Sequence, residues 1–168
     1  MTSEVPTHLS ALIEAEYTKY FVIDIDGTIA NCENRLYHIK NDEVKDWDSF
    51  YNEVGADAPM IGMIAIVLQL SQRYIPVFCT GRPERVREAT RRWIQTNLGK
   101  RLATAPILMR PDGDHRPDHE VKPELLKKFV GEYLFRESVA FILEDRSGIT
   151  ERWRELGFRV LQVAKGDY

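Results

Sequence analysis

The chain has 168 residues, of which 43% are hydrophobic and 29% are charged, a composition typical of a single soluble globular domain. Its 23 basic and 26 acidic side chains leave a formal net charge of −3, which argues against a protein that wraps nucleic acid with its whole surface. Cys32 and Cys79 lie far apart and form no CxxC motif, which argues against a disulfide scaffold or a cysteine-based zinc site.

The sequence contains no segment typical of a membrane or secreted protein. No apolar run reaches the roughly 18 residues that a bilayer span requires. The stretch Met1–Glu16 carries acidic residues and lacks the basic start and apolar centre of a secretion signal. Because the chain also has no repeat and no Gly/Ser linker, we expect one cytoplasmic domain over residues 1–168 without a membrane partner.

Short β-rich runs alternate with helical stretches along the chain. In chain order we expect a helix over His8–Tyr17, a strand over Tyr20–Ile25, an irregular segment over Asn31–Asp57 with a short helical piece around Trp47–Val54, a helix over Pro59–Tyr74, a strand over Ile75–Cys79, a helix over Glu84–Leu98, a strand over Ile107–Met109, a charged loop over Arg110–Val121, a helix over Pro123–Phe135, a strand over Val139–Leu143, a helix over Ile149–Leu156 and a strand over Phe158–Val163. This alternation predicts an α/β fold with a doubly wound parallel sheet of about five strands and helices on both faces. Chemistry in such folds is expected at the C-terminal ends of the strands.

The first strand ends in Asp24-Ile25-Asp26-Gly27-Thr28. Strand alternation places Asp24 and Asp26 on the same face, and paired carboxylates repel each other unless a cation holds them. A hard divalent metal with oxygen ligands is the natural partner. The alternative is an Asx-turn at a strand end, which accounts for a single aspartate better than for this run.

The second strand ends in Thr80-Gly81-Arg82. A hydroxyl and the backbone N–H groups of Gly81 and Arg82, placed before a helix, are typical of an anion-binding site. An ordinary N-cap threonine explains the same residues equally well.

Two more charged groups stand at expected element boundaries. Lys122 follows a loop and opens a helix with Pro123, where a solvated lysine is the usual case. Glu144 and Asp145 end the fourth strand, either as a charged strand exit or as a second acidic tip of the same sheet. Carboxylates, a metal and phosphate-binding donors together indicate phosphoryl transfer. No GxxxxGK[ST] loop is present, which favours hydrolysis of a phosphate ester over an ATP-consuming kinase.

The order of these motifs resembles that of the haloacid dehalogenase (HAD) phosphohydrolases, with Asp24–Thr28, Thr80, Lys122 and Glu144-Asp145 as the first to fourth motifs. A closer likeness is to the 3′-phosphatase domain of phage polynucleotide kinase–phosphatases, carried by DIDGTIA at 24–30, TGR at 80–82, MRPDGDHRPD at 109–118, EDR at 144–146 and LQVAKGDY at 161–168. The chain departs from that family by lacking a kinase domain and by having Glu144 where aspartate is common. The resemblance implies a HAD-like Rossmannoid fold with a small cap insertion at about 31–58.

The resemblance also implies roles for the motif residues. Asp24 would be the nucleophile that forms an aspartyl-phosphate, and Asp26 the general acid and then the base for water. Thr80 would bind the phosphoryl oxygens, and Lys122 would stabilise the charge on the phosphoaspartate.

The implied cofactor is Mg²⁺, held by Asp24, the backbone carbonyl of Asp26 and Asp145. Glu144 would lie in the outer shell of the metal or orient Lys122. Which of Glu144 and Asp145 ligates the metal directly stays open, because glutamate has an extra methylene.

Substrate-binding roles are implied for Thr28, Arg35, Gly81, Arg82 and Asp118. Without the resemblance, solvated surface would be the preferred interpretation of Arg35, Arg82 and Arg110. In the cap, Trp47, Phe50 and Tyr51 form either a small core, which is the favoured interpretation, or a platform on which a base stacks.

The main hypothesis is therefore a Mg²⁺-dependent phosphatase that removes 3′-phosphates from nucleic acid ends, in the host cytoplasm if the chain is phage-encoded. A separate kinase or ligase is an expected partner. One alternative has the same phosphatase mechanism but another substrate: a 5′(3′)-nucleotidase that acts on free nucleoside monophosphates. A non-catalytic module that binds a phosphorylated ligand is the alternative of another class, and the complete residue set speaks against it.

Overall fold

The computed structural model describes residues 12, 15–40 and 45–166. Most of the helix expected over His8–Tyr17 lies outside the described residues, and Leu12 and residues 15–17 of it are helical. No helix in the described part of the chain combines the length and the apolar character that a bilayer span requires.

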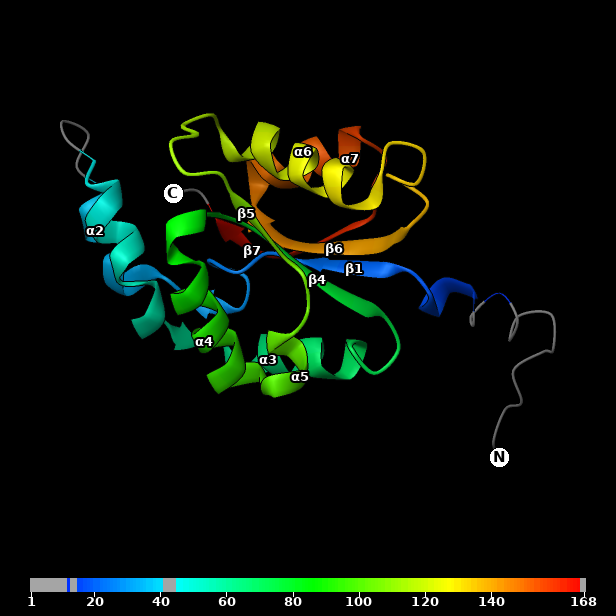
Figure 1. Cartoon of the computed structure of the whole chain (residues 1–168), viewed down its shortest axis with the longest axis horizontal. Coiled ribbons are helices and arrows are strands. Elements are labelled where there is room, and N and C mark those ends of the chain that lie inside the picture. Colours follow the sequence, from blue (N-terminus) through cyan, green and yellow to red (C-terminus); the bar gives the residue numbers. More distant parts are fainter. Residues whose placement is uncertain (1–11, 13–14, 41–44, 167–168) are drawn as a thin grey trace.

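A five-stranded sheet with the order β5-β4-β1-β6-β7 forms the centre of the protein (Figure 1). Every neighbouring pair of strands is parallel. The strands are β1 (Tyr20–Ile23), β4 (Ile75–Pro83), β5 (Ile107–Arg110), β6 (Val139–Arg146) and β7 (Val160–Gly166). β1 lies in the middle because its apolar residues are buried on both faces of the sheet. The expected doubly wound parallel sheet of five strands is confirmed.

Helices cover both faces of the sheet (Figure 1). The helices are α3 (Ile61–Leu70), α4 (Arg87–Leu98) and α5 (Lys100–Ala103) on one face, and α6 (Asp118–Val130) and α7 (Ser147–Glu155) on the other. Strand alternation divides β1 between the two layers. Phe21 and Ile23 pack into the core beneath α4, whereas Val22 packs with Leu126 and Trp153 beneath α6 and α7.

An insertion between β1 and α3 forms a small substructure beside the C-terminal edge of the sheet. Its elements are β2 (Ala30–Asn31), the 3₁₀ helix η1 (Glu33–His38), α2 (Trp47–Asn52), the 3₁₀ helix η2 (Val54–Ala56) and β3 (Ala58–Pro59). β2 and β3 pair antiparallel, which brings the two ends of the insertion together. The insertion has its own apolar cluster of Cys32, Leu36, Ile39 and Phe50. It corresponds to the segment expected to be a cap.

The structure corrects several expected boundaries. α6 begins at Asp118 and not at Pro123, so Lys122 lies inside the helix and does not open it. Asp118 and Glu120 in the first turn favour this earlier start, because negative side chains stabilise a helix N-terminus. The helix ends at Val130 and not at Phe135, because Gly131 follows with a φ of 84°. β4 and β6 run on through Pro83 and Arg146 and thus include the motif residues.

Candidate active site

Lys122 forms the centre of a buried charge cluster at the C-terminal edge of the sheet. Its Nζ donates to Asp24 Oδ1 at 2.7 Å and to Glu144 Oε2 at 2.8 Å. Asp24 directly follows β1, Glu144 lies near the end of β6, and Lys122 reaches them from the second turn of α6. All three side chains are buried. The structure therefore joins three of the motifs at one point.

Three carboxylates at this point form a group that could hold a metal ion. One oxygen from each of Asp24, Glu144 and Asp145 lies within 4.8 Å of the others. Thr28 donates its hydroxyl to Asp24 Oδ2 at 3.1 Å, which fixes the rotation of that carboxyl group. Hard oxygen ligands of this kind suit Mg²⁺. Because Lys122 neutralises only one of the three negative charges, the donor set fits a divalent cation.

β7 shapes the position of Asp145. Gln162 donates its side-chain amide to the backbone carbonyl of Asp145 at 2.9 Å. A Cβ atom on Gly166 would lie 2.1 Å from Asp145 Oδ2, so the backbone can pass this close only as glycine. The sequence motif near the C-terminus is recognisable as a family likeness, but it does not reveal this contact.

Burial and charge set the protonation of the cluster. Burial, and next the Glu144 carboxylate, raise the pKa of Asp24 to about 7, although Lys122 opposes the shift. Burial also raises the pKa of Glu144. Burial lowers the pKa of Lys122, but the two carboxylates outweigh it and hold that pKa well above its ordinary value. Lys122 is therefore a permanent cation, and a further cation would favour ionised Asp24.

Two arginines hold the carboxylate of Asp26. Arg82 Nη2 donates to Asp26 Oδ1 at 2.6 Å, and Arg82 Nε donates to both carboxylate oxygens at 3.1 Å. Arg35 Nη2 donates to the same carboxylate. Burial favours the neutral acid, but the two guanidinium groups outweigh it and lower the pKa of Asp26.

Arg35 and Arg82 are inside the protein, with 0% of each residue exposed. Arg110 is buried as well, so the interpretation of these three arginines as solvated surface was wrong. Arg35 and Arg82 also contact Asp57, a fully buried carboxylate that sequence analysis missed. Nothing in the local sequence marks Asp57, because its partners come from segments far along the chain.

Thr80 occupies a different setting from the one expected. β4 continues past it to Pro83, and the 3₁₀ helix η3 (Glu84–Val86) precedes α4, so Thr80 neither caps a helix nor lies at a helix N-terminus. The N–H of Arg82 donates to Thr80 Oγ1 at 3.3 Å and is not directed at a ligand. The buried Thr80 hydroxyl remains close to the Asp24 end of the sheet through the pairing of β4 with β1.

Asp118, the first residue of α6, joins that helix to the ends of β5 and β6. It accepts from Arg110 and, at 2.9 Å, from Arg146 Nη1. A Cβ on Gly81 would lie 2.5 Å from Asp118 Oδ1, so the close approach of β4 to α6 requires glycine. Gly81 and Asp118, both predicted to bind substrate, thus lie in contact at the wall of the site.

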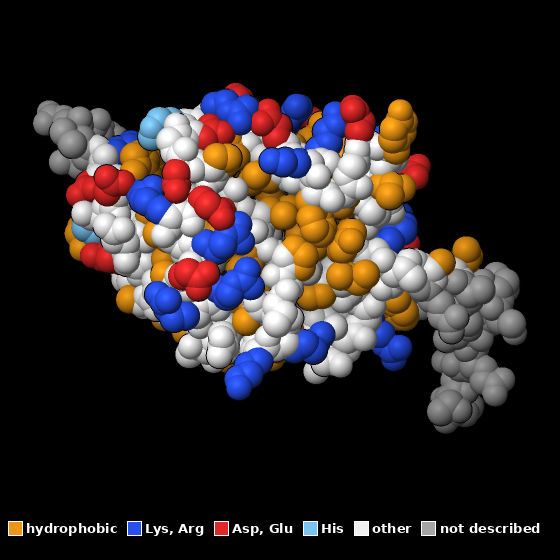
Figure 2. Space-filling model, in the orientation of Figure 1, with side chains coloured by type: hydrophobic (Ala, Val, Ile, Leu, Met, Phe, Trp, Pro, Cys, Tyr) orange, Lys and Arg blue, Asp and Glu red, His pale blue; other side chains and the backbone are white. Residues whose placement is uncertain are grey.

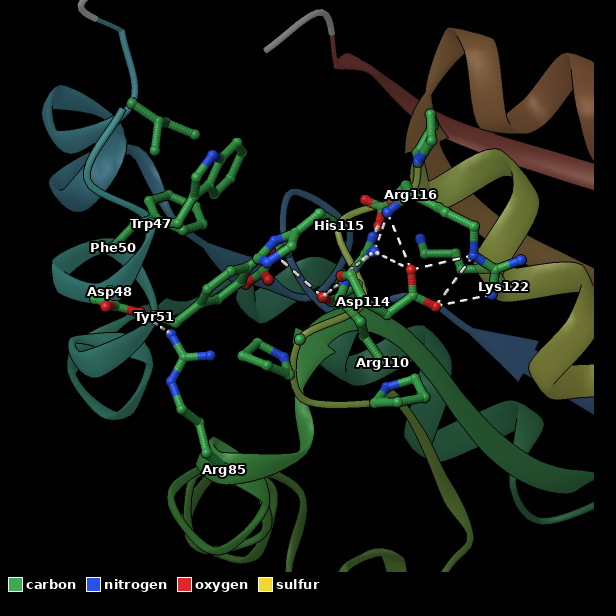
Figure 3. A pocket seen from close by; sticks show the side chains of 18 of the residues that line it. Trp47, Asp48, Phe50, Tyr51, Arg85, Arg110, Asp114, His115, Arg116 and Lys122 are labelled. Carbon is green, nitrogen blue, oxygen red and sulfur yellow. Dashed lines mark hydrogen bonds and ion pairs between the residues drawn. The ribbon is translucent and has the colours of Figure 1, made fainter. Parts of the chain in front are cut away.

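A cavity of about 360 Å³ opens above these groups. Asp24, Asp26 and Lys122 line its floor. Trp47 and Tyr51 of α2 line one wall, and the loop between β5 and α6, with Asp114, His115 and Arg116, faces them (Figure 3). A ligand in this cavity would meet carboxylates and a lysine at one end and aromatic rings at the other.

The family model of the polynucleotide kinase PNKP phosphatase domain matches residues 18–168. Two chains from structures of the Pnkp1/Rnl/Hen1 complex, one described as an RNA repair complex, are 26% identical with TM-scores of 0.67 and 0.68. Each match covers 90% of this chain but only 47% and 44% of those chains, so this chain spans less than half of their length.

More distant structures share the fold. A haloacid dehalogenase-like hydrolase from Streptococcus pneumoniae is 12% identical with a TM-score of 0.58, the match covering 87% of this chain and 84% of that one. A HAD enzyme from Bacteroides thetaiotaomicron, solved with magnesium and inorganic phosphate, is 12% identical with a TM-score of 0.51, over 89% and 96% of the two chains. The match over nearly the whole chain shows that this protein belongs to the PNKP-type phosphatase domains of the HAD phosphatases.

Proposed function

We propose that the protein is a Mg²⁺-dependent phosphatase that removes 3′-phosphates from nucleic acid ends through an aspartyl-phosphate on Asp24. The observation that carries this proposal is the buried Asp24 carboxylate at the floor of an open cavity, with Lys122 Nζ at 2.7 Å and Asp145 beside it. Membership of the PNKP-type phosphatase domains supports the choice of a nucleic acid 3′-phosphate as the substrate.

The reaction would run in two displacements at phosphorus. In the first, an Asp24 oxygen bonds to phosphorus, the bond from phosphorus to the 3′-oxygen breaks, and Asp26 gives a proton to that oxygen. In the second, a water oxygen bonds to phosphorus, Asp26 takes the water proton, and Asp24 leaves as a carboxylate. Lys122 would offset the charge on the Asp24 phosphate throughout.

Mg²⁺ bound by Asp24 and Asp145, with the Asp26 carbonyl, would neutralise charge on the phosphoryl group. Glu144 is held by Lys122 at 2.8 Å, and this supports a role in orienting Lys122. Thr80 would donate its hydroxyl to a phosphoryl oxygen. A dianionic phosphate close to Asp26 would raise the pKa of that acid, which supports uptake of the proton when substrate binds.

The cap aromatics support a nucleoside as the rest of the substrate. Phe50 is buried in the apolar cluster of the cap, whereas Trp47 is 43% exposed, and both side chains line the cavity. The rings of Trp47 and Tyr51 lie nearly parallel, with centroids 5.8 Å apart and an angle of 22°. Such a face can stack on any nucleobase.

The charge of the cavity wall favours a short substrate. The Asp, Arg and Lys residues that line the cavity are five acids and five bases, Asp24, Asp26, Asp48, Asp114 and Asp118 against Arg85, Arg110, Arg116, Lys122 and Arg146. Basic and acidic side chains are also interspersed on the face in Figure 2. A surface that tracks a phosphate backbone is usually basic. This balance favours a second candidate function, a 5′(3′)-nucleotidase that acts on free nucleoside monophosphates.

Phosphate release from a substrate panel separates the two functions. A 3′-phosphorylated oligonucleotide and the matching 3′- and 5′-mononucleotides are compared in Mg²⁺. We expect the oligonucleotide to have the highest kcat/KM. Higher kcat/KM for either mononucleotide would favour the nucleotidase, and absence of turnover on every phosphomonoester would contradict both functions and support a binding module.

Loss of the Trp47 ring is expected to lower kcat/KM for substrates that carry a base. Trp47→Ala should lower kcat/KM for the 3′-phosphorylated oligonucleotide about tenfold, the value of one lost base stack. The same variant should leave the kcat/KM of a base-free phosphomonoester unchanged. Tyr37→Ala is the matched control, because Tyr37 is an exposed cap aromatic that does not line the cavity. An equal loss on both substrates would contradict base stacking.

Mg²⁺ is expected to stabilise the folded protein as well as to support turnover. At a Mg²⁺ concentration on the order of 100 times Kd, Tm should rise by about 8 °C relative to EDTA. Asp145→Asn should remove this rise, whereas the exposed Asp48→Asn should keep it. A full Mg²⁺-dependent rise in Asp145→Asn would contradict the assigned metal ligand.

A separate kinase or ligase is proposed as a partner. The matched chains come from a Pnkp1/Rnl/Hen1 complex and are more than twice as long as the part that this chain covers. Removal of the 3′-phosphate leaves a 3′-hydroxyl, which is the group that a ligase joins to a 5′-phosphorylated end. Co-purification of the partner from the native source would test this proposal.

A further inference from the structure

Asp26, Arg35, Asp57 and Arg82 form a closed ring of ion pairs. Arg35 donates through Nε and Nη2 to the two oxygens of Asp57 at 2.7 and 2.8 Å, and it also donates to Asp26. Arg82 Nη2 donates to Asp57 Oδ2 at 2.7 Å and to Asp26 Oδ1 at 2.6 Å. Each arginine thus bridges both aspartates, and the two positive charges balance the two negative ones.

The two aspartates of the ring differ in their access to the cavity. The Asp57 side chain is 0% exposed, as are those of Arg35 and Arg82, whereas the Asp26 side chain is 16% exposed and lines the cavity. Asp57 therefore has no route to a substrate. Any effect of Asp57 on the reaction must pass through the arginines to Asp26.

Asp57 is itself held from two sides. Its backbone carbonyl accepts the indole N–H of Trp93 in α4 at 2.7 Å. It stands between η2 and β3, where the cap insertion returns to the sheet domain. Trp93 of the core therefore fixes the backbone that carries the Asp57 carboxylate, although Asp57 lies at the end of the cap insertion.

The ring joins the cap to the sheet. Arg35 comes from η1 of the cap, where its guanidinium lies 4.1 Å over the Phe50 ring and donates to the Phe50 carbonyl at 3.2 Å. Arg82 comes from β4, and its Nη1 donates to Thr90 of α4 at 3.3 Å. The cap therefore supplies Arg35 and Asp57, and the sheet domain supplies Arg82 and Asp26.

We propose that Asp57 is a positioning residue that orients Arg35 and Arg82 so that the Asp26 carboxyl group faces the leaving oxygen of the substrate. The proposal rests on the proposed function, in which Asp26 gives a proton to that oxygen. Without the Asp57 carboxylate, two buried guanidinium groups would share the single negative charge of Asp26 and draw that side chain towards themselves, because a buried charge without a partner is strongly unfavourable. The seating of the cap thus sets the position of the proton donor.

Asp57→Asn tests this role, because asparagine has the same shape but offers an N–H₂ group to a guanidinium that needs an acceptor. The measured quantity is kcat/KM, which reports the transfer of the phosphoryl group to Asp24. A nucleoside 3′-phosphate has an alkoxide leaving group that needs a proton. The leaving group of p-nitrophenyl phosphate is p-nitrophenolate, a weak base that leaves without one. We expect a loss of about 100-fold on the nucleoside 3′-phosphate and of less than about threefold on p-nitrophenyl phosphate.

Two further variants control the result. Glu53→Gln is the matched control, because Glu53 is a partly exposed cap carboxylate paired with His38, outside the ring; both substrates should be turned over as in the wild type. Arg35→Lys keeps the positive charge but loses the bidentate contact with the Asp57 carboxylate. It should show the same selective loss and keeps the proposal testable if Asp57→Asn does not fold.

The outcomes distinguish a failure of the proposed role of Asp26 from a failure of the proposed role of Asp57. Asp26→Asn must itself lose activity selectively on the nucleoside 3′-phosphate; equal losses on both substrates would contradict the proposed role of Asp26. If Asp26→Asn is selective but folded Asp57→Asn and Arg35→Lys lose both substrates equally, Asp57 has only a structural role and the proposal is overturned. Wild-type rates in either folded variant would overturn it as well.

Discussion

Replacing Asp24 by asparagine is expected to lower phosphate release by about four to six orders of magnitude, the loss typical of a removed nucleophile. The amide oxygen of asparagine can still accept from Lys122, but it does not displace an alkoxide from phosphorus. The fold should be retained. Burial and Glu144 raise the pKa of Asp24 to about 7, so the ionised carboxyl group destabilises the folded state above its unfolded pKa. The neutral amide removes that penalty.

Phosphate release and thermal unfolding, measured at pH 8 on both proteins, check this expectation. Asp48→Asn is the matched control, because Asp48 lines the same cavity but is highly exposed and pairs with Arg85. That control should keep activity within about threefold. An Asp24→Asn protein that retains one tenth of wild-type activity would rule out Asp24 as the nucleophile.

Replacing Lys122 by methionine is expected to affect both activity and stability. The change leaves the buried carboxylates of Asp24 and Glu144 facing each other without their shared cation. Removing one partner of a buried ion pair typically costs about 3–5 kcal/mol of unfolding free energy. Turnover should fall by about two to three orders of magnitude, because the charge on the phosphoaspartate loses its counter-ion.

The stability loss should depend on pH. In the variant, the pKa values of the two carboxyl groups rise further above their unfolded values, so the folded state binds more protons than the unfolded state. Stability then falls as the pH rises from about 4 through the raised folded pKa values. In the wild type, the pKa of Lys122 lies well above its ordinary value, so the lysine stays charged over this range.

Urea unfolding in EDTA at pH 5.5 and pH 8 measures the difference. Lys127→Met is the matched control, because Lys127 lies on the same helix but pairs with Glu132 at the surface. Glu144→Gln added to Lys122→Met should restore part of the stability at pH 8. A Lys122→Met protein that loses the same free energy at both pH values, or none, would contradict the charge cluster.

The order of the elements could be predicted because strands and helices of this fold carry strong apolar patterns. The runs around Phe21–Ile23 and Ile142 are buried on both sides, and such continuous apolar runs indicate parallel strands. β2 and β3 were missed because two-residue strands have no pattern to detect. The start of α6 was missed because Asp118–Val121 looks like part of a charged loop, although its acids suit a helix N-terminus.

The meeting of Asp24 and Glu144 could be predicted because the C-terminal ends of parallel strands share one edge of the sheet. Strand order does not predict the approach of Lys122, which reaches them from α6. The burial of Arg35 and Arg82 could not, because arginine is rarely buried unless paired, and the pairing depends on how the cap folds back. The contact between Gly166 and Asp145 likewise arises only from the register of β6 with β7. Composition and spacing contain no such information.

The stereochemistry at phosphorus shows whether the phosphoryl group passes through Asp24. A nucleoside 3′-phosphorothioate made chiral with ¹⁸O is hydrolysed in H₂¹⁷O, and the configuration of the released thiophosphate is determined. Transfer to Asp24 followed by transfer to water gives two inversions, so we expect overall retention of configuration. Net inversion would mean that water attacks the substrate directly, and it would contradict an aspartyl-phosphate on Asp24.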